Sequence, residues 1–141
     1  MQLKLVTLSG VKLNEAIYSA AIPTRDGIIG VFPSHEPLIT LAESGVIAVR
    51  RNQTDHDDEL EYFAISGGVV EINHSSITIL VDEADHGDDI IEAETKAALE
   101  RALQQRDQAE TQIEREKAHQ LIDRHLVRLK VADLQRRKRK R

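Results

Sequence analysis

The sequence contains no cysteine, three prolines and seven glycines, and aromatic side chains make up 3% of its residues. The absence of cysteine excludes disulfides and thiolate metal sites, and it is compatible with a reducing compartment. Because aromatic side chains are so few, aliphatic side chains must fill the core. No run approaches the roughly 20 apolar residues that a membrane-spanning helix needs. The N-terminus also lacks the basic start and apolar segment of a signal peptide, so none is expected.

Helix-breaking residues are absent from the C-terminal part of the chain, because Pro37 is the last proline and Gly87 the last glycine. A helical region is therefore predicted from residue 88 onward. Asp89 and Glu92 have the spacing of an N-terminal capping box. Two thin apolar stripes follow, and neither would form a stable helix alone, so they must pack on each other, on the rest of the chain or on a partner. The stripes are Ile91, Ala98, Ala102 and Ala109, then Ala118, Ile122, His125, Leu129 and Ala132.

The polar residues 106–112 separate the two stripes and contain no glycine, proline or asparagine. A hairpin of two antiparallel helices would turn at Asp107 or Thr111. A single continuous helix is the competing arrangement.

The first 86 residues read as short strands separated by turn residues, which is typical of a β-sandwich. Pro23 is expected to end the third strand, because proline donates no ladder hydrogen bond. The acidic segment 52–59 is expected to form an exposed hairpin loop. The expected strands are 2–8, 11–13, 15–22, 28–32, 38–41, 45–51, 62–65, 69–72 and 77–81, and the expected core of the last hairpins includes Ile65, Val69, Ile72, Ile77, Ile79 and Val81.

The fold class predicted is thus a β-sandwich followed by a C-terminal α-helical hairpin. The domains expected are 1–86, the sandwich, and 87–141, a helical segment that we call the arm.

The formal net charge is −5, and the charged side chains are distributed unevenly along the chain. Residues 1–85 hold five basic and thirteen acidic side chains, whereas residues 86–141 hold fourteen basic and eleven acidic ones. The basic side chains concentrate after Arg124 and end in the run Arg136–Arg141. An acidic body with a basic tip suggests docking onto an acidic partner, nucleic acid or an anionic membrane. A solvated chain end is the simpler interpretation of the charge alone.

No catalytic or metal-binding constellation is visible. Ser34 and His35 are adjacent, but nothing nearby would orient the imidazole as a catalytic triad requires. The six histidines include no pair at helical spacing, so a zinc site is not expected. We therefore predict a non-catalytic chain without a cofactor or metal.

The segments Ile22–Thr40 and Ile65–Ala84 resemble the epsilon subunit of F-type ATP synthases. Ile22–Thr40, Ile-Pro-Thr-Arg-Asp-Gly-Ile-Ile-Gly-Val-Phe-Pro-Ser-His-Glu-Pro-Leu-Ile-Thr, is similar to the family's Gly-x-x-Gly-x-x-Pro-x-His-x-Pro-Leu signature. Ile65–Ala84 begins Ile-Ser-Gly-Gly-Val-Val-Glu-Ile and ends Ile-Thr-Ile-Leu-Val-Asp-Glu-Ala, like the last sandwich strands of the same family. The resemblance covers nearly the whole chain.

The resemblance implies a non-catalytic rotor subunit that couples proton translocation to ATP synthesis and inhibits ATP hydrolysis through its C-terminal helices. The implied partners are the stalk gamma subunit, the membrane c-ring and the catalytic alpha and beta subunits, with no nucleic acid. It implies a peripheral position on the cytoplasmic face of the plasma (inner) membrane, attached through the complex, with an organellar equivalent left open.

The resemblance also implies contact residues. At the end of the sandwich that faces the rotor stalk and the ring, these are Ile28, His35, Pro37 and Leu38. His35 is equally well explained as a loop histidine that shapes the turn between Pro33 and Pro37. The family often has an acidic residue where this chain has Ile28, so contact there is expected to be apolar. On the arm, Arg124, Arg128 and Lys130 are implied to face acidic catalytic subunits.

Some members of the family bind ATP between the two helices. Glu92, Arg124 and Arg128 match part of their motif, but Thr95 replaces its first-helix arginine. Without that bidentate contact to phosphate, ATP binding is expected to be weak or absent. The alternative function is a free-standing β-sandwich binding module whose basic helical arm docks on nucleic acid or an acidic protein.

Overall fold

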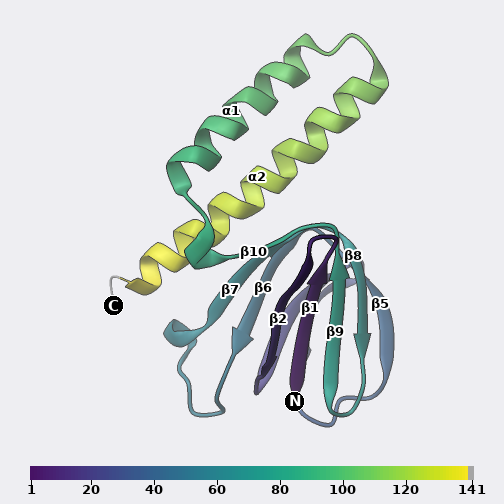
Figure 1. The fold of residues 1–141 in the computed structure, drawn as a ribbon, viewed down its shortest axis with the longest axis vertical. Coiled ribbons are helices and arrows are strands. Elements are labelled where there is room, and N and C mark those ends of the chain that lie inside the picture. The colour runs from purple at the N-terminus through teal and green to yellow at the C-terminus, as the bar shows by residue number, and fades with distance from the viewer. Residues whose placement is uncertain (140–141) are drawn as a thin grey trace.

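The computed structural model describes residues 1–139, with side chains through residue 138, and has a sandwich of strands below a helical hairpin (Figure 1). The predicted fold class is confirmed. The strands are β1 Gln2–Thr7, β2 Gly10–Ala16, β3 Ser19–Thr24, β4 Gly27–Val31, β5 Leu38–Ala42, β6 Gly45–Arg50, β7 Glu61–Ile65, β8 Gly68–Ile72, β9 Ser76–Val81 and β10 Ala84–His86. The helices are η1 Asp57–Glu59, η2 Gly87–Asp89, α1 Glu92–Gln108 and α2 Gln112–Arg139.

The strands follow the order β10-β7-β6-β3-β5-β8-β9-β1-β2, and β4 pairs with β3. The junction between β3 and β5 consists of one residue pair, Thr24 opposite Ala42, so the sheet folds there into two layers. Alternating aliphatic side chains from both layers fill the interior. Its fully buried members include Leu3, Leu5, Ile22, Ile47, Val70, Ile77 and Ile79.

Of the predicted core of the last hairpins, Val69 is the exception, because it lies on the exposed face. Val70, directly opposite Ile79, is buried in its place. A one-residue change of register reverses which side chains point inward. Gly67 and Gly68, at the start of this strand, have no side chains, so the inward-facing positions could not be counted from them.

Two predictions about the third strand are wrong. Its predicted span, 15–22, is interrupted at Ile17 and Tyr18, whose N–H groups donate to the carbonyls of Met1 and Arg50 (2.8 and 2.9 Å). Pro23 lies inside β3 rather than ending it. The pairs between β3 and β6 end at Ala21. Pro23 has no N–H group to donate, but no residue of β6 lies opposite it to need that hydrogen bond.

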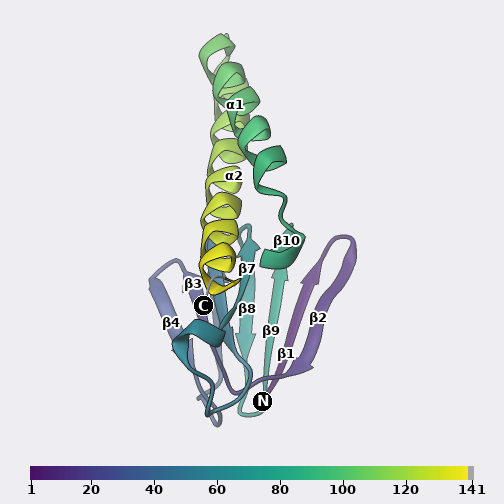
Figure 2. The same cartoon turned by 90° about the vertical axis from the view of Figure 1, so that its left-hand side faces the viewer.

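The helices form the hairpin rather than one continuous helix (Figures 1 and 2). Thr111 starts the second helix: its hydroxyl accepts the Glu114 N–H (3.1 Å), and the Glu114 carboxylate accepts the Glu110 N–H (3.0 Å). Asp107, the other expected turn residue, lies within α1. The predicted capping box at Asp89 is wrong, because Asp89 belongs to η2 and Ile91 precedes α1 without a side-chain cap.

The C-terminal half of α2 lies on the outer side of β7 and β6, while α1 packs along α2 (Figure 2). Buried Val131 and Ala132 contact Ala64 and Ile90 in a small second core. The backbone of Gly87 also lies close to the side chain of Gln135 on α2, since a Cβ added at Gly87 would lie 2.9 Å from Gln135 Oε1. The arm is therefore docked on the sandwich. Within residues 1–139, neither α1 nor α2 is both long and apolar enough to cross a membrane.

Candidate functional site

An apolar band crosses the outer face of five neighbouring strands. Successive members are direct cross-strand partners, from β5 through β8, β9 and β1 to β2. Leu80 at the centre of the band is 51% exposed. A contiguous exposed apolar surface of this kind is typical of a protein–protein interface. The band consists of exposed Leu41, Val69, Leu80 and Val11 together with half-buried Val6.

The four sandwich residues implied as ring contacts lie at two opposite ends of the fold. Ile28, 75% exposed, follows the turn at Gly27, whose positive φ of 114° suits glycine. This turn lies beside the β5–β6 connection, since the Glu43 N–H donates to the Pro23 carbonyl (3.0 Å). His35, Pro37 and Leu38 follow β4 instead, beside the β8–β9 turn, where the Ser34 N–H donates to the His74 carbonyl (3.1 Å).

The loop around His35 is shaped by its own backbone. The His35 Nδ1 contacts the Glu36 carbonyl oxygen at 2.7 Å, and Ser34 has a positive φ of 65°. A non-glycine residue in this conformation must be held there by its surroundings. The His35 side chain is half-buried, and the loop residues on both sides of it, Ser34 and Glu36, are exposed.

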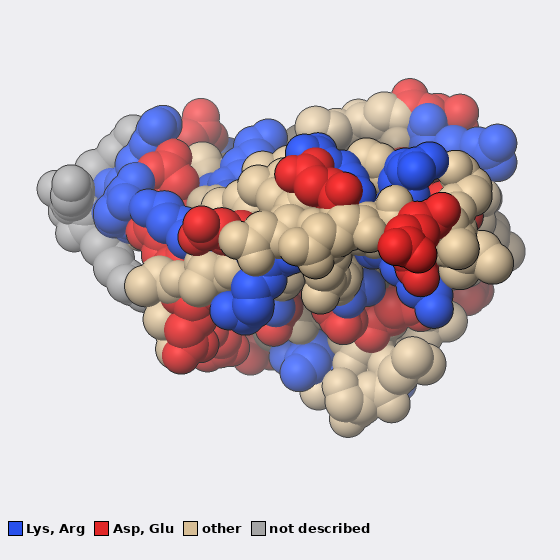
Figure 3. Space-filling view, turned by 90° about the horizontal axis from the view of Figure 1, so that it is seen from above, with Lys and Arg blue, Asp and Glu red and all other residues tan. Residues whose placement is uncertain are grey.

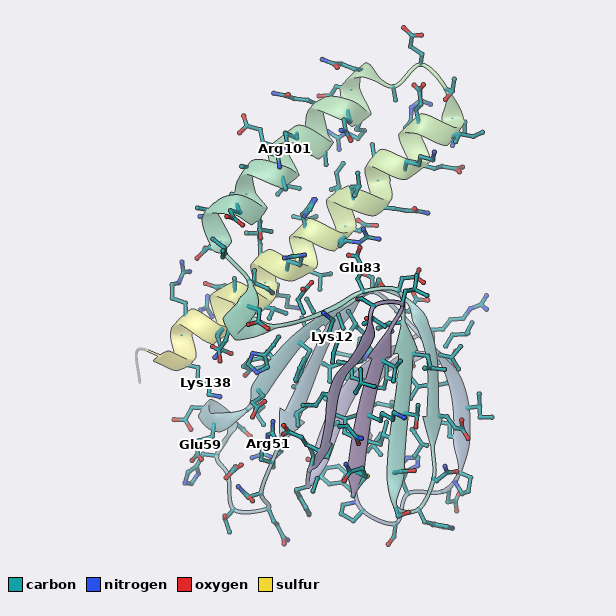
Figure 4. All side chains as sticks on the ribbon, in the orientation of Figure 1. Lys12, Arg51, Glu59, Glu83, Arg101 and Lys138 are labelled. Carbon is teal, nitrogen blue, oxygen red and sulfur yellow. The ribbon has the colours of Figure 1, made fainter. Side chains whose placement is uncertain are left out.

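On the arm, the arginines implied to face a partner are turned toward the sandwich. Arg124 pairs with Glu83 (3.2 Å), and Arg128 pairs with Asp85 on β10 (3.1 Å). Glu83 lies directly beneath α2 in the connection between β9 and β10 (Figure 4). Lys130, by contrast, is exposed. Seen from above, basic and acidic side chains alternate over this side of the molecule (Figure 3).

The three residues that match the ATP motif do not converge. Glu92 pairs with Arg136 (3.1 Å) and Lys96 (3.5 Å), away from the two ion pairs of Arg124 and Arg128. Thr95 is buried, and its hydroxyl donates to the Ile91 carbonyl (3.0 Å).

A hollow of about 270 Å³ does lie between the helices. Arg101, His125 and Arg128 line it together with the carboxylates of Asp89 and Glu94. Those two acidic groups would repel a polyphosphate.

His125 occupies a junction between the two helices and the sandwich. Burial lowers the pKa of its imidazole, and the nearby guanidinium groups of Arg128, Arg124 and Arg101 lower it further, against the opposing effect of Glu83. Its Nδ1 is buried without a hydrogen-bond partner among the described residues. The site therefore favours a neutral imidazole.

A second polar cluster links the sandwich to the start of the arm. Glu61 accepts two hydrogen bonds from Arg51 (2.6 and 3.1 Å) and contacts His86 Nε2 at 3.3 Å. The bond from Arg51 lowers the pKa of the Glu61 carboxyl, although burial opposes the shift. The other nitrogen of His86 accepts the Asp88 N–H (2.9 Å), and Asp88 accepts from Gln135 (2.7 Å). No metal-binding group of acidic, histidine or cysteine side chains is present among the described residues.

The family described as "ATP synthase, Delta/Epsilon chain, beta-sandwich domain" matches residues 1–87. The ATP synthase epsilon chain of Chloroflexus aggregans is 33% identical over 140 residues, which are 99% of this chain and 97% of the relative. The chain belongs to the ATP synthase epsilon-chain family. The epsilon chain of Desulforamulus reducens is 30% identical over 132 residues, covering 94% of this chain and 96% of the relative.

Solved structures contain chains with the same fold. A chain in the mitochondrial ATP synthase of Euglena gracilis, a structure of OSCP, F1 and the c-ring, has a TM-score of 0.71 at 23% identity. The match covers 86% of this chain and 74% of that chain. A chain in the central stalk and c-ring of the Tetrahymena thermophila mitochondrial ATP synthase has a TM-score of 0.59 at 15% identity, with 94% and 96% covered.

For this epsilon-chain family member, sequence reasoning missed several of the residues that the fold brings together. Glu83 and Asp85 were not singled out, because their role depends on which face α2 turns toward β10. His125 carried a usable signal, since it was the single polar member of the second apolar stripe. In the basic run Arg136–Arg141, Arg136 pairs with Glu92 and Arg137 with Asp133, both at 3.1 Å. The end of that run, including Lys140 and Arg141, lies outside the described residues.

Proposed function

We propose that this chain is the epsilon subunit of the central stalk of an F-type ATP synthase, a non-catalytic subunit without a cofactor. Its sandwich would bind the gamma subunit and the c-ring, and its arm would restrain ATP hydrolysis by the alpha and beta subunits. The apolar band centred on Leu80 is the observation that carries the proposal. It gives the sandwich a broad outer surface suited to permanent contact with another subunit.

The band supports stalk binding because its register is regular. Five side chains from five strands stand opposite one another, so they form one continuous surface rather than scattered exposed residues. A rigid sheet of this kind can transmit torque without changing shape, which suits a subunit that rotates with the stalk. In this role the chain would help couple proton translocation to ATP synthesis. Its position would be peripheral, on the cytoplasmic face of the membrane that holds the complex.

The remaining predicted contact residues of the sandwich lie at its two opposite ends. The exposed loop containing His35, Pro37 and Leu38 lies far from the arm, and we assign it to the c-ring side. Ile28 lies at the arm-bearing end, so we assign its exposed side chain to a subunit other than the ring.

The arm supports a regulatory role because it is attached by limited contacts. Its apolar contact with the sandwich is made by Val131, Ala132 and half-buried Val127, and two half-buried arginines of α2 add ion pairs to Glu83 and Asp85. Such pairs contribute about 0–1 kcal/mol each. A partner with a preference for the released arm could therefore shift the equilibrium. We propose that the released arm presents Arg124, Arg128 and Lys130 to acidic groups of the catalytic subunits.

Co-purification with the gamma subunit tests the proposal. Leu80→Lys should abolish or greatly weaken gamma binding without lowering the melting temperature, because an exposed side chain is replaced. Leu126→Lys is the matched control, since Leu126 on α2 has nearly the same exposure, 50%. Equal gamma binding by both variants and the unaltered chain would contradict the band as the stalk contact.

The alternative, a nucleic-acid-binding module, predicts tight and strongly salt-dependent binding to bulk DNA. The pairing of Arg124 and Arg128 with sandwich carboxylates argues against DNA binding by the docked arm, because both cations are then neutralised. DNA binding without gamma binding would favour the alternative.

A further inference from the structure

A second row of side chains runs beside the apolar band on the same outer face of the sheet. Its members are again direct cross-strand partners from β5 through β8, β9 and β1 to β2. On β5, β8, β9 and β1 each lies two residues from a member of the band, and such residues share a face of a strand. The second row consists of Ile39, Glu71, Thr78, Lys4 and Asn14.

Two opposite charges lie symmetrically in the second row, on either side of β9. Glu71 on β8 and Lys4 on β1 both stand directly opposite Thr78. Neighbouring strands lie about 4.8 Å apart, so the two charges are separated by roughly 10 Å. Both side chains are exposed, and neither makes an ion pair with another residue of the described part of the chain. Their charges are therefore available to a partner.

This face is complementary to itself about a two-fold axis that runs along β9. Such an axis places Leu80 over Leu80 of a second copy and Val6 over Val69 of that copy. In the second row it places Lys4 over Glu71 of the second copy, and Glu71 over Lys4. A two-fold interface forms each contact twice, so the pair of charges in one chain gives two ion pairs in the dimer.

The charges favour this axis over a two-fold axis that runs across the strands. An axis across the strands at the second row would place Lys4 over Lys4 and Glu71 over Glu71 of the second copy, and like charges repel. An axis midway between the rows would bury both charges against Val6 and Val69, which is costly without a partner group. The axis along β9 pairs both charges and keeps the apolar rows together.

We propose that the isolated chain forms a symmetric homodimer through this face, with β9 on the two-fold axis. The face is accessible, because α1 and α2 pack on the other layer of the sandwich, over β7 and β6 (Figure 2). Five strands extend over about 20 Å and the two rows lie about 7 Å apart. The contact is thus smaller than the roughly 800 Å² per partner of a standard interface. A weak dimer with a micromolar Kd follows.

The dimer covers the apolar band that the proposed function assigns to the gamma subunit. Dimer formation and gamma binding therefore exclude each other, a consequence that rests on the proposed function. Before assembly the dimer would keep the band out of water. Because the dimer is weak, binding of the monomer to gamma would draw the equilibrium toward dissociation.

Sedimentation equilibrium of the whole chain at low ionic strength tests the dimer. The parent should show a reversible equilibrium between monomer and dimer. Lys4→Glu places a carboxylate over Glu71 of the second copy, and Glu71→Lys places an ammonium group over Lys4. Each variant should raise the Kd of the dimer about tenfold or more, because both ion pairs become repulsive.

An equimolar mixture of Lys4→Glu and Glu71→Lys tests the axis itself. In the mixed dimer every contact of the second row again joins opposite charges, so the Kd should return to near the parental value. The matched controls are Lys117→Glu and Glu100→Lys, which make the same charge changes at exposed positions of α2 and α1. These controls should keep the parental Kd alone and when mixed. Circular dichroism and melting temperature establish that each variant is folded.

Three results would overturn the proposed dimer: a parent that stays monomeric at submillimolar concentration, a parent that forms larger oligomers, or a mixture that associates no more tightly than its components. Addition of the gamma subunit to the parent should dissociate the dimer, and a dimer that binds gamma intact would overturn the exclusion. The dimer measurements contain no gamma subunit. The dimer can therefore fail while gamma binding stands, and gamma binding can fail while the dimer forms.

Discussion

Gly68 on β8 lies directly against the backbone carbonyl of Leu80 on β9, and a Cβ at Gly68 would overlap that carbonyl oxygen. The neighbour is main chain in a paired strand, so it cannot move aside without breaking the ladder. Gly68→Ala should therefore destabilise the sandwich by roughly 1–3 kcal/mol, as overpacking does. Gly30→Ala is the control, because its Cβ would make an ordinary contact at 3.5 Å. Equal unfolding midpoints in urea for both variants would contradict the packing described here.

The two faces of β9 should respond differently to truncation. Ile79 is fully buried between the layers, whereas Leu80 points into the exposed apolar band. Ile79→Ala should lower the free energy of unfolding by about 2–5 kcal/mol, and Leu80→Ala should change it by less than about 0.5 kcal/mol. Thermal or urea unfolding measures both free energies. A large loss of stability for Leu80→Ala would show that Leu80 faces the core rather than solvent.

Acid should weaken the sandwich through Glu61. The hydrogen bond from Arg51 lowers the pKa of this carboxyl in the folded state, despite the opposing effect of burial. Its stabilising effect is therefore present above the unfolded pKa of about 4.3 and is lost as the pH falls further. Glu61→Gln should flatten the dependence of melting temperature on pH below that value. Glu71→Gln, at an exposed position, is the control and should leave this dependence unchanged. If the melting temperatures of the parent and Glu61→Gln fall equally at acidic pH, Glu61 does not have this role.

Isothermal titration should detect no tight ATP binding by the isolated chain. Glu92, Arg124 and Arg128 are each engaged in separate ion pairs, and Thr95 is buried where the family motif has an arginine. Saturable binding at micromolar ATP would show that the hollow beside Arg101 and His125 accepts a nucleotide despite its acidic lining.

The sandwich could be predicted from sequence because alternating aliphatic residues and turn residues define its strands locally. Pro23 and Asp89 were misread because each is governed by pairing elsewhere: Pro23 by the point where β6 leaves β3, and Asp89 by the short helix that joins the domains. Local rules for proline and for caps contain neither piece of information.

The contact residues were harder to place. Ile28 and His35 are close in sequence but lie at opposite ends of β4, so a short motif describes two separate surfaces. The i, i+4 spacing of Arg124 and Arg128 correctly predicted that they share one face. It could not show that this face meets Glu83 and Asp85, because that depends on how α2 rests on β7.

We propose that the sandwich binds the stalk and that the arm restrains ATP hydrolysis. The most direct test compares ATP hydrolysis by the assembled complex carrying either the full chain or residues 1–87. The truncated chain should assemble with the gamma subunit at normal stoichiometry, and the resulting complex should hydrolyse ATP faster. Normal assembly with unchanged hydrolysis at both low and high ATP would contradict the regulatory role of the arm.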